Sequence, residues 1–156
     1  MRPPGTFGLQ LAAMDSLSPR ARSGNMRRIP SHDTKPELTV RSLVHRMGFR
    51  FSLRRTDLPG KPDLAFVSRH KIIFVHGCFW HQHSGCRDGR LPLSRQDYWR
   101  PKLASNTIRD RKALRQLRRQ GWKCLVVWEC QVSDPHELRN RLGRFLEQTD
   151  AAPLGS

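Results

Sequence analysis

An apolar run passes into a cluster of histidines and cysteines in IIFVHGCFWHQHSGC, residues 72–86. The four apolar residues at 72–75 are typical of a strand in a protein core. Residues 77–93, which contain the rest of the cluster, are rich in His, Cys, Gly and charge and have no apolar period. We therefore expect a long loop held by something other than a hydrophobic core, and a metal ion would serve.

Four thiol and imidazole ligands lie in this loop and after the next apolar run, at Cys78, His83, Cys86 and Cys130. A structural zinc ion binds four such groups in a tetrahedron, and it would join the loop to the strand that ends near Cys130. The alternative is that they are unrelated buried thiols and surface histidines. Cys124 lies inside that strand, where we expect a small core residue.

Apolar periodicity predicts the elements that come before the loop. A first helix begins with Asp33 as its N-cap and ends before Gly48. Alternating residues at 49–54 and apolar runs at 64–67 and 72–75 then predict a meander of three strands.

The second half of the chain predicts two helices and one strand. A long helix over 94–119 is expected to break at Pro101, and an apolar strand follows at 124–128. Asp134 caps the last helix, which has Pro135 at its first position. Because the late strand follows a helix, we expect it to pair in parallel, which gives an α/β fold with a mixed sheet and helices on both faces.

Charge indicates the kind of partner. The chain has 156 residues, enough for one domain, with 29 Lys and Arg against 13 Asp and Glu, a formal net charge of +16 and a pI near 11.4. A chain with this charge is expected to bind a polyanion, and nucleic acid is the natural candidate. No stretch approaches the roughly 20 apolar residues of a membrane-spanning helix, and the N-terminus lacks the pattern of a secretory signal. We therefore expect a cytoplasmic protein.

Three segments divide the chain. Residues 1–30 are rich in Pro, Gly, Ser and Arg and cannot build a core, so we expect a flexible basic arm. The alternative for residues 1–25 is a leader with no role. The folded domain is expected over 31–149, with a flexible tail over 150–156.

A candidate catalytic acid ends the segment LPGKPD, residues 58–63. A rigid turn delivers Asp63 to the start of an apolar strand, where Mg²⁺-dependent nucleases hold a carboxylate against the scissile phosphate. The alternative is a turn-forming or capping Asp. His76 and His81 are expected at the same end of the sheet, where they could act as acid and base. Glu37 could orient metal-bound water, although the helix dipole alone favours a Glu there.

Aromatic side chains divide into two groups. Phe79, Trp80 and Trp99 lie near basic residues, where flat rings could wedge into or stack on opened base pairs, but core packing explains them equally well. Trp122 and Trp128 flank an apolar strand, so we expect them in the core.

Several motifs together resemble the Vsr-type very short patch repair endonucleases, over residues 25–131. The motifs are DTKPE (33–37), LPGKPD (58–63), FVHGCFWH (74–81), NTIRD (106–110) and GWKCLVVWEC (121–130). The resemblance implies a restriction-endonuclease-like fold and a nick placed 5′ to the thymine of a T:G mismatch that arises from deaminated 5-methylcytosine. It implies monomeric action on double-stranded DNA and allows mismatch-repair proteins as further partners.

The same resemblance implies roles for individual residues. Mg²⁺ would be held by Asp63 and the backbone carbonyl of Val75, and structural Zn²⁺ by the four ligands already named. His81 would be the catalytic histidine. The supporting residues would be His76, Glu37 and Asp110, and the intercalating residues Phe79, Trp80, Trp99 and, in the arm, Met26. The loop departs from the usual pattern at Gln82 and at Ser84-Gly85.

Two other functions remain open from the sequence. A nuclease of the same fold could cut matched DNA at a specific site, as a restriction-like enzyme does. A zinc-stabilised module that only binds DNA would need the basic helix and the metal ligands, but it would have no use for Asp63 or His81.

Overall fold

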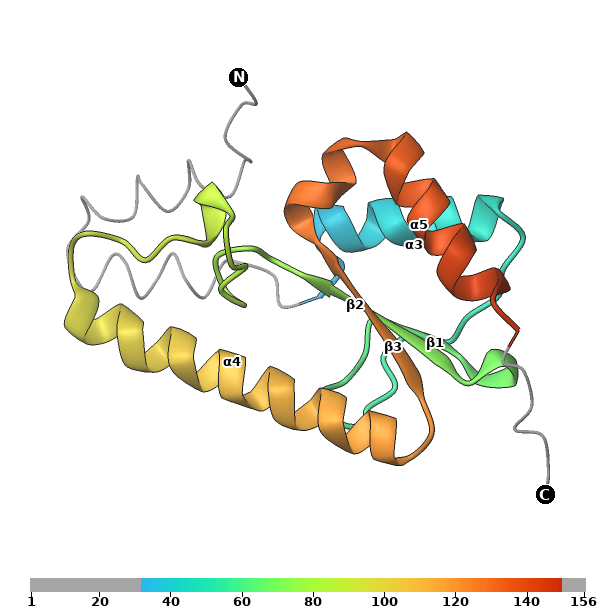
Figure 1. The fold of residues 1–156 in the computed structure, drawn as a ribbon, viewed down its shortest axis with the longest axis horizontal. Helices are drawn as coiled ribbons and strands as arrows, with labels where there is room; N and C mark the ends of the chain where they lie inside the picture. The colour runs from blue at the N-terminus through green and yellow to red at the C-terminus, as the bar shows by residue number, and fades with distance from the viewer. Residues whose placement is uncertain (1–31, 150–156) are drawn as a thin grey trace.

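A three-stranded mixed sheet, in the order β1-β2-β3, lies between two layers of helix (Figure 1). The structure is a computed structural model and describes residues 32–149. Strand β1 (Leu64–Phe66) is antiparallel to β2 (Lys71–His76), which is parallel to β3 (Lys123–Trp128). Helix α4 (Gln96–Arg119) carries the chain back between the two parallel strands, as the sequence predicts. The predicted α/β fold is therefore confirmed.

Strand β2 is central, and all six of its residues are buried. Its alternating side chains reach two cores, because successive residues of a strand point to opposite faces. On one face Ile73 packs with α3 (Lys35–Arg46) and α5 (Pro135–Glu147). On the other face Ile72 packs with Leu117 of α4. Figure 1 shows α3 and α5 together on one side of the sheet and α4 along the other.

The first helix begins one residue later than predicted. Thr34, not Asp33, is the N-cap, and its hydroxyl accepts a hydrogen bond from the Glu37 N–H at 3.4 Å. Asp33 has a φ of 55° and lies outside the helix, with its carboxylate paired to Arg41 and Arg54. The ion pairs use the side chain that a cap would have needed.

The predicted meander is wrong in its first strand. Residues 49–54 form only an isolated bridge, between Ser52 and Ala65. Strand β1 is three residues long and so offers little edge for pairing. Arg54, at a φ of 53°, then turns the chain away. Phe49 still contributes to the core, at 9% exposure.

The predicted break at Pro101 is also wrong, because α4 continues through this residue. A proline inside a helix removes one backbone hydrogen bond. Here the first turns of α4 are held by burial of Trp99 and Leu103, each at 1% exposure, against Phe79. Tertiary packing therefore outweighs the cost of the proline. The last helix, α5, begins as predicted, and Asp134 accepts from the Glu137 N–H at 3.1 Å.

Some sequence predictions fall outside the described residues. The arm over 1–30, with Met26, and the tail over 150–156 belong to segments on which the structure gives no description. Within residues 32–149, no helix is both long and apolar enough to cross a lipid bilayer.

Candidate active site and metal centre

The carboxylate of Asp63 is held by a backbone group at the end of β2. Its Oδ2 accepts a hydrogen bond from the Val75 N–H at 2.6 Å. Leu64 pairs with Ile73, so the partner of Val75 in the same register would be Pro62, which lies outside β1. The Asp63 side chain therefore takes the place of a strand partner and is fixed at this end of the sheet.

Burial makes it hard for Asp63 to ionise. The pKa of Asp63 is raised from 3.8 to about 7, chiefly because burial removes water around the carboxyl, with the negative charge of Glu37 acting in the same direction. The Val75 N–H, Arg41 and His81 act in the opposite direction. A cation bound at Asp63 would offset both the burial of this carboxyl and the negative charge of Glu37.

Two histidines and a second aspartate gather at the same strand end. The rings of His76 and His81 stack with centroids 3.8 Å apart and planes inclined by 6°. His81 Nδ1 lies 2.6 Å from Oδ2 of Asp110, which comes from the middle of α4. Burial lowers the pKa of His76 to about 4, with the neighbouring His81 as the second cause. His76 is therefore neutral near pH 7.

Glu37 reaches this group from α3 and is buried, at 5% exposure. Its Oε2 accepts from the Asp33 N–H at 2.9 Å and from Arg41 Nη2 at 3.1 Å. The predicted residues thus come together from α3, the residue before β1, the end of β2, the loop after β2 and α4; they are Glu37, Asp63, His76, His81 and Asp110.

The four predicted zinc ligands also come together. Strand pairing explains how, because His76 pairs with Trp128 in the parallel ladder. Cys78 and Cys130 each follow two residues beyond this pair, so both lie past the same edge of the sheet. The loop then turns back, with the His83 N–H donating to the Cys78 carbonyl at 2.9 Å.

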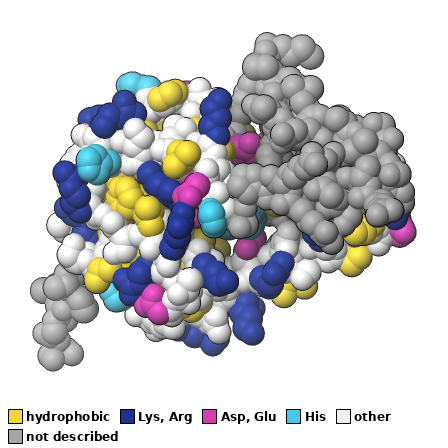
Figure 2. Space-filling view, turned by 180° about the vertical axis from the view of Figure 1, so that it is seen from behind, with side chains coloured by type: hydrophobic (Ala, Val, Ile, Leu, Met, Phe, Trp, Pro, Cys, Tyr) yellow, Lys and Arg dark blue, Asp and Glu magenta, His cyan; other side chains and the backbone are white. Residues whose placement is uncertain are grey.

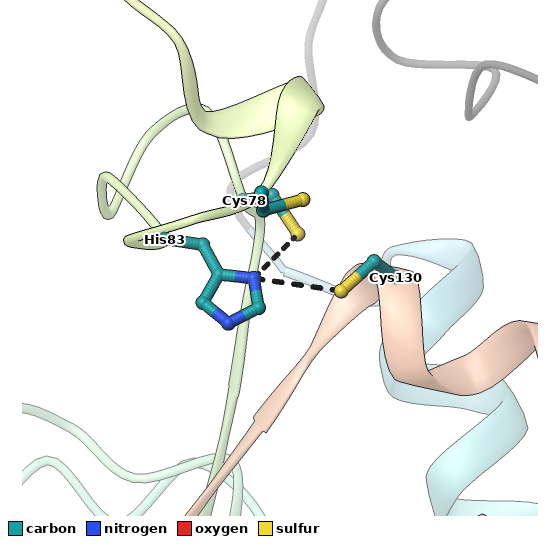
Figure 3. A group of neighbouring side chains, drawn as sticks. Cys78, His83 and Cys130 are labelled. Atoms are coloured by element: carbon teal, nitrogen blue, oxygen red, sulfur yellow. Dashed lines mark hydrogen bonds between the residues drawn. The ribbon is translucent and has the colours of Figure 1, made fainter.

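The distances among these ligands fit a tetrahedral zinc ion. His83 Nδ1 lies 3.6 Å from the sulfur of Cys78 and 3.4 Å from that of Cys130 (Figure 3). Bonds of about 2.3 Å to sulfur and about 2.0 Å to nitrogen would place the nitrogen about 3.5 Å from each sulfur in a tetrahedron. With Cys86, the four ligand atoms lie within 4.8 Å of one another, and all four cysteines of the chain are free thiols. The donor set and its spacing suit Zn²⁺.

Two residues beside the cluster were not predicted. The Trp128 ring stacks on His83 with centroids 4.2 Å apart, so this half-buried tryptophan lies against the metal ligands instead of in the main core. The positive charge of Arg141 contributes to lowering the pKa of His83, after burial. Trp122 is in the core as predicted, and Cys124 packs at its edge.

The loop has a small apolar core of its own, contrary to the sequence prediction. Phe79, Trp99 and Leu103 form it, and Trp80 and Leu91 pack against it. Phe79 and Trp99 are 4% and 1% exposed, so both would have to leave their packing to reach a base pair. Trp80 is half-buried, and the Lys102 ammonium lies 5.7 Å from its ring centroid.

Positive charge covers much of the surface around these groups. Figure 2 shows many Lys and Arg side chains over the visible face and few acidic ones, some of which lie beside histidines. On α4 the exposed basic side chains include Arg109, Arg111 and Lys112, next to Asp110. The candidate catalytic residue Asp110 thus lies on a helix whose exposed basic side chains suit contact with phosphates.

Comparisons with known proteins give related activities. The family model described as DNA mismatch endonuclease Vsr matches residues 14–87. The type II nicking enzyme V.XorIIP of Xanthomonas oryzae pv. oryzae is 50% identical over 133 residues, which are 85% of this chain and 97% of the relative. The type II nicking enzyme V.NmeAIP of Neisseria meningitidis is 37% identical over 86% of this chain and 95% of its own. The DNA mismatch endonuclease Vsr of Escherichia coli is 38% identical over 75% and 74%.

Proposed function

Because this chain belongs to the Vsr family of DNA endonucleases, we propose that it nicks duplex DNA 5′ to the thymine of a T:G mismatch, with Mg²⁺ at Asp63. The observation that carries the proposal is the convergence of Asp63 with the His81–Asp110 pair at one end of β2. Support for the mismatch comes from the Escherichia coli relative, which is named a mismatch endonuclease.

Asp63 and the backbone carbonyl of Val75 are the groups that would hold Mg²⁺. When bound, the ion neutralises charge on the phosphate and makes a coordinated water more acidic. A raised pKa at Asp63 supports this assignment, because a cation offsets the cost of ionising a partly buried carboxylate. The Val75 N–H fixes Oδ2, so one residue would serve the site through both of its backbone groups.

His81 would act as the general base. Its Nδ1 faces Asp110 at 2.6 Å, which favours the tautomer with the proton on Nδ1 and leaves the lone pair on Nε2. His76 is better suited to hold the His81 ring by stacking than to donate a proton, since its pKa is lowered to about 4. Glu37 would orient water beside Asp63.

Zn²⁺ at Cys78, His83, Cys86 and Cys130 would serve the same site indirectly. The ligand Cys78 lies two residues beyond His76, and His81 lies between two of the ligands. An ion that fixes this loop would therefore fix His81 beside His76, the last residue of β2. Among the aromatic residues, half-buried Trp80 is the one best placed to stack on an opened base pair.

Cleavage of paired substrates tests this function. Purified protein and Mg²⁺ are incubated with duplexes labelled differently on each strand, which carry a T:G mismatch or a matched pair in cytosine-methyltransferase contexts. We expect a nick only in the thymine strand of the mismatch, lost in Asp63→Ala. Asp57→Ala is the matched control, because this carboxylate is exposed and paired with Arg55. Tight binding without a cut in any context would leave a DNA-binding module.

A second candidate is a nickase of matched sites. The relatives at 50% and 37% identity are named type II nicking enzymes, with no mismatch in the name. Cutting of the matched duplex by the wild type, with the same loss in Asp63→Ala, would favour this function over mismatch repair.

A further inference from the structure

Arg41 bridges two carboxylates at the edge of the candidate active site. Its Nη1 donates to Oδ1 of Asp33 at 2.6 Å, and its Nη2 donates to Oε2 of Glu37 at 3.1 Å. The guanidinium is largely buried, with 13% of the side chain exposed, and the Glu37 side chain is 6% exposed. This pair is therefore shielded from water, unlike the ordinary surface pair at i,i+4.

The contacts of Arg41 set the position of Glu37. Both hydrogen bonds to Glu37, from Arg41 and from the Asp33 N–H, converge on Oε2, so neither engages Oε1. The planar guanidinium has a fixed fork of donors, which defines the direction of each carboxylate. Its Nε is buried and has no hydrogen-bond partner in the part of the chain that the structure describes. The two carboxylates therefore determine where this side chain lies.

Arg41 also supplies charge where two acids approach each other. The negative charge of Glu37 acts to raise the pKa of Asp63, and the positive charge of Arg41 acts to lower it. Without the arginine, Glu37 would be a buried carboxylate with no cation beside it, which is costly.

We propose that Arg41 is a positioning residue of the nicking reaction, which acts by holding Glu37 beside Asp63. The inference rests on the proposed function, since it gives Glu37 its task in cleavage. It adds a residue of α3 that makes no contact with the reacting atoms. Loss of an outer partner of this kind typically costs about 10- to 100-fold in activity.

The first test is a double-mutant cycle on single-turnover nicking at saturating DNA. We expect Arg41→Gln to slow cleavage about 10- to 100-fold, Arg41→Lys to slow it less, and Arg46→Gln, on the exposed end of the same helix, to leave it unchanged. If Arg41 acts through Glu37, the variant with both Glu37→Gln and Arg41→Gln is no slower than Glu37→Gln alone. Independent, multiplying effects would overturn the inference.

Two further readouts separate positioning from other roles. DNA affinity measured without Mg²⁺ should be the same for Arg41→Gln as for Arg46→Gln. Weaker DNA binding by Arg41→Gln alone would mean that Arg41 contacts a phosphate, which would overturn the inference. The second readout is the midpoint of urea unfolding, which is measured without DNA. It should fall in Arg41→Gln and recover in the double variant, because the orphaned carboxylate is removed. No recovery would overturn the inference, whereas a wild type that cuts no duplex would refute the proposed function.

Discussion

Replacing Asp63 with Asn should stabilise the Mg²⁺-free protein while it abolishes nicking. Asn keeps a side-chain oxygen that can accept from the Val75 N–H, and it removes the charge that burial disfavours. The pKa of Asp63 rises from 3.8 to about 7 on folding, a shift worth about 4 kcal/mol at 1.36 kcal/mol per unit. Because the carboxyl keeps some contact with water, we expect a gain of about 2–4 kcal/mol at pH 8.

The sign of the pH dependence follows from the raised pKa. Between pH 3.8 and about 7 the folded protein holds a proton on Asp63 that the unfolded chain has lost, so wild-type stability falls as pH rises through this window. Below this pH window the cost of ionising Asp63 in the folded protein disappears, and above the window that cost is complete. The difference between Asp63→Asn and the wild type should therefore grow by about 1–3 kcal/mol from pH 5 to pH 8.

Urea unfolding of the zinc-loaded proteins at both pH values measures this difference. Both proteins share the cysteine cluster, so its own pH dependence cancels in the comparison. Asp57→Asn is the control, because the pKa of this exposed, Arg55-paired carboxyl is lowered and its loss should bring no gain. The net charge of +16 argues against a general benefit from removing an acid. An Asp63→Asn protein less stable than wild type at pH 8, or a difference independent of pH, would refute the reasoning.

Three other changes test the remaining parts of the structure. Cys130→Ser should lower the zinc content, measured by metal analysis, and raise the protease sensitivity of residues 77–93, measured by limited proteolysis. Full zinc content in this variant would contradict the assignment of Cys130 as a ligand. Gly60→Ala should destabilise the protein by about 2 kcal/mol, because the φ of Gly60 is 76° and an added Cβ would lie 2.7 Å from the Cβ of Ala113. An unchanged midpoint of thermal unfolding would argue against this packing. Lys71→Met should lower the free energy of unfolding in urea by about 2 kcal/mol or more, because the buried ammonium donates to three carbonyls at the end of α5. An unchanged free energy would mean that water replaces the ammonium at these carbonyls.

Residue chemistry made the convergence of the three cysteines and His83 predictable. Cysteine and histidine are few, and four of them near the ends of two apolar runs restrict the arrangement to one edge of a sheet. The parallel register then carries Cys78 and Cys130 to the same place. The position of Asp63 at this end of the sheet was predictable for a similar reason, because an acid at the start of a buried strand needs a polar partner, here the Val75 N–H.

Other features depend on tertiary contacts that periodicity does not reveal. Residues 49–54 alternate like a strand, but the neighbouring β1 is too short to pair with them beyond one bridge. Pro101 disfavours a helix locally, and burial of Trp99 and Leu103 outweighs it. The mistaken view of the loop as coreless has the same cause, since its apolar partners come from α4.

Arginines were the hardest residues to interpret from the sequence. Arg41 and Arg141 act through buried contacts, but a chain with 29 Lys and Arg gives no compositional reason to single them out. The spacing of Glu37 and Arg41, four residues apart on one helix, was a signal that could have found the first of them. Arg141, which lies on α5, has Glu137 at the same spacing, but the structure pairs Glu137 with Arg144, so that signal would not have pointed to the cluster.

The order of the zinc ligands along the chain has a consequence for biosynthesis. Cys78, His83 and Cys86 leave the ribosome well before Cys130, and β3, which pairs with β2, is also made late. A nascent chain that stops at the end of α4 would carry the basic helix and every candidate catalytic side chain, but it would lack β3 and the fourth candidate zinc ligand, Cys130. Competence to cut DNA should therefore arrive only after β3 and Cys130 have been made and have joined the earlier part of the chain.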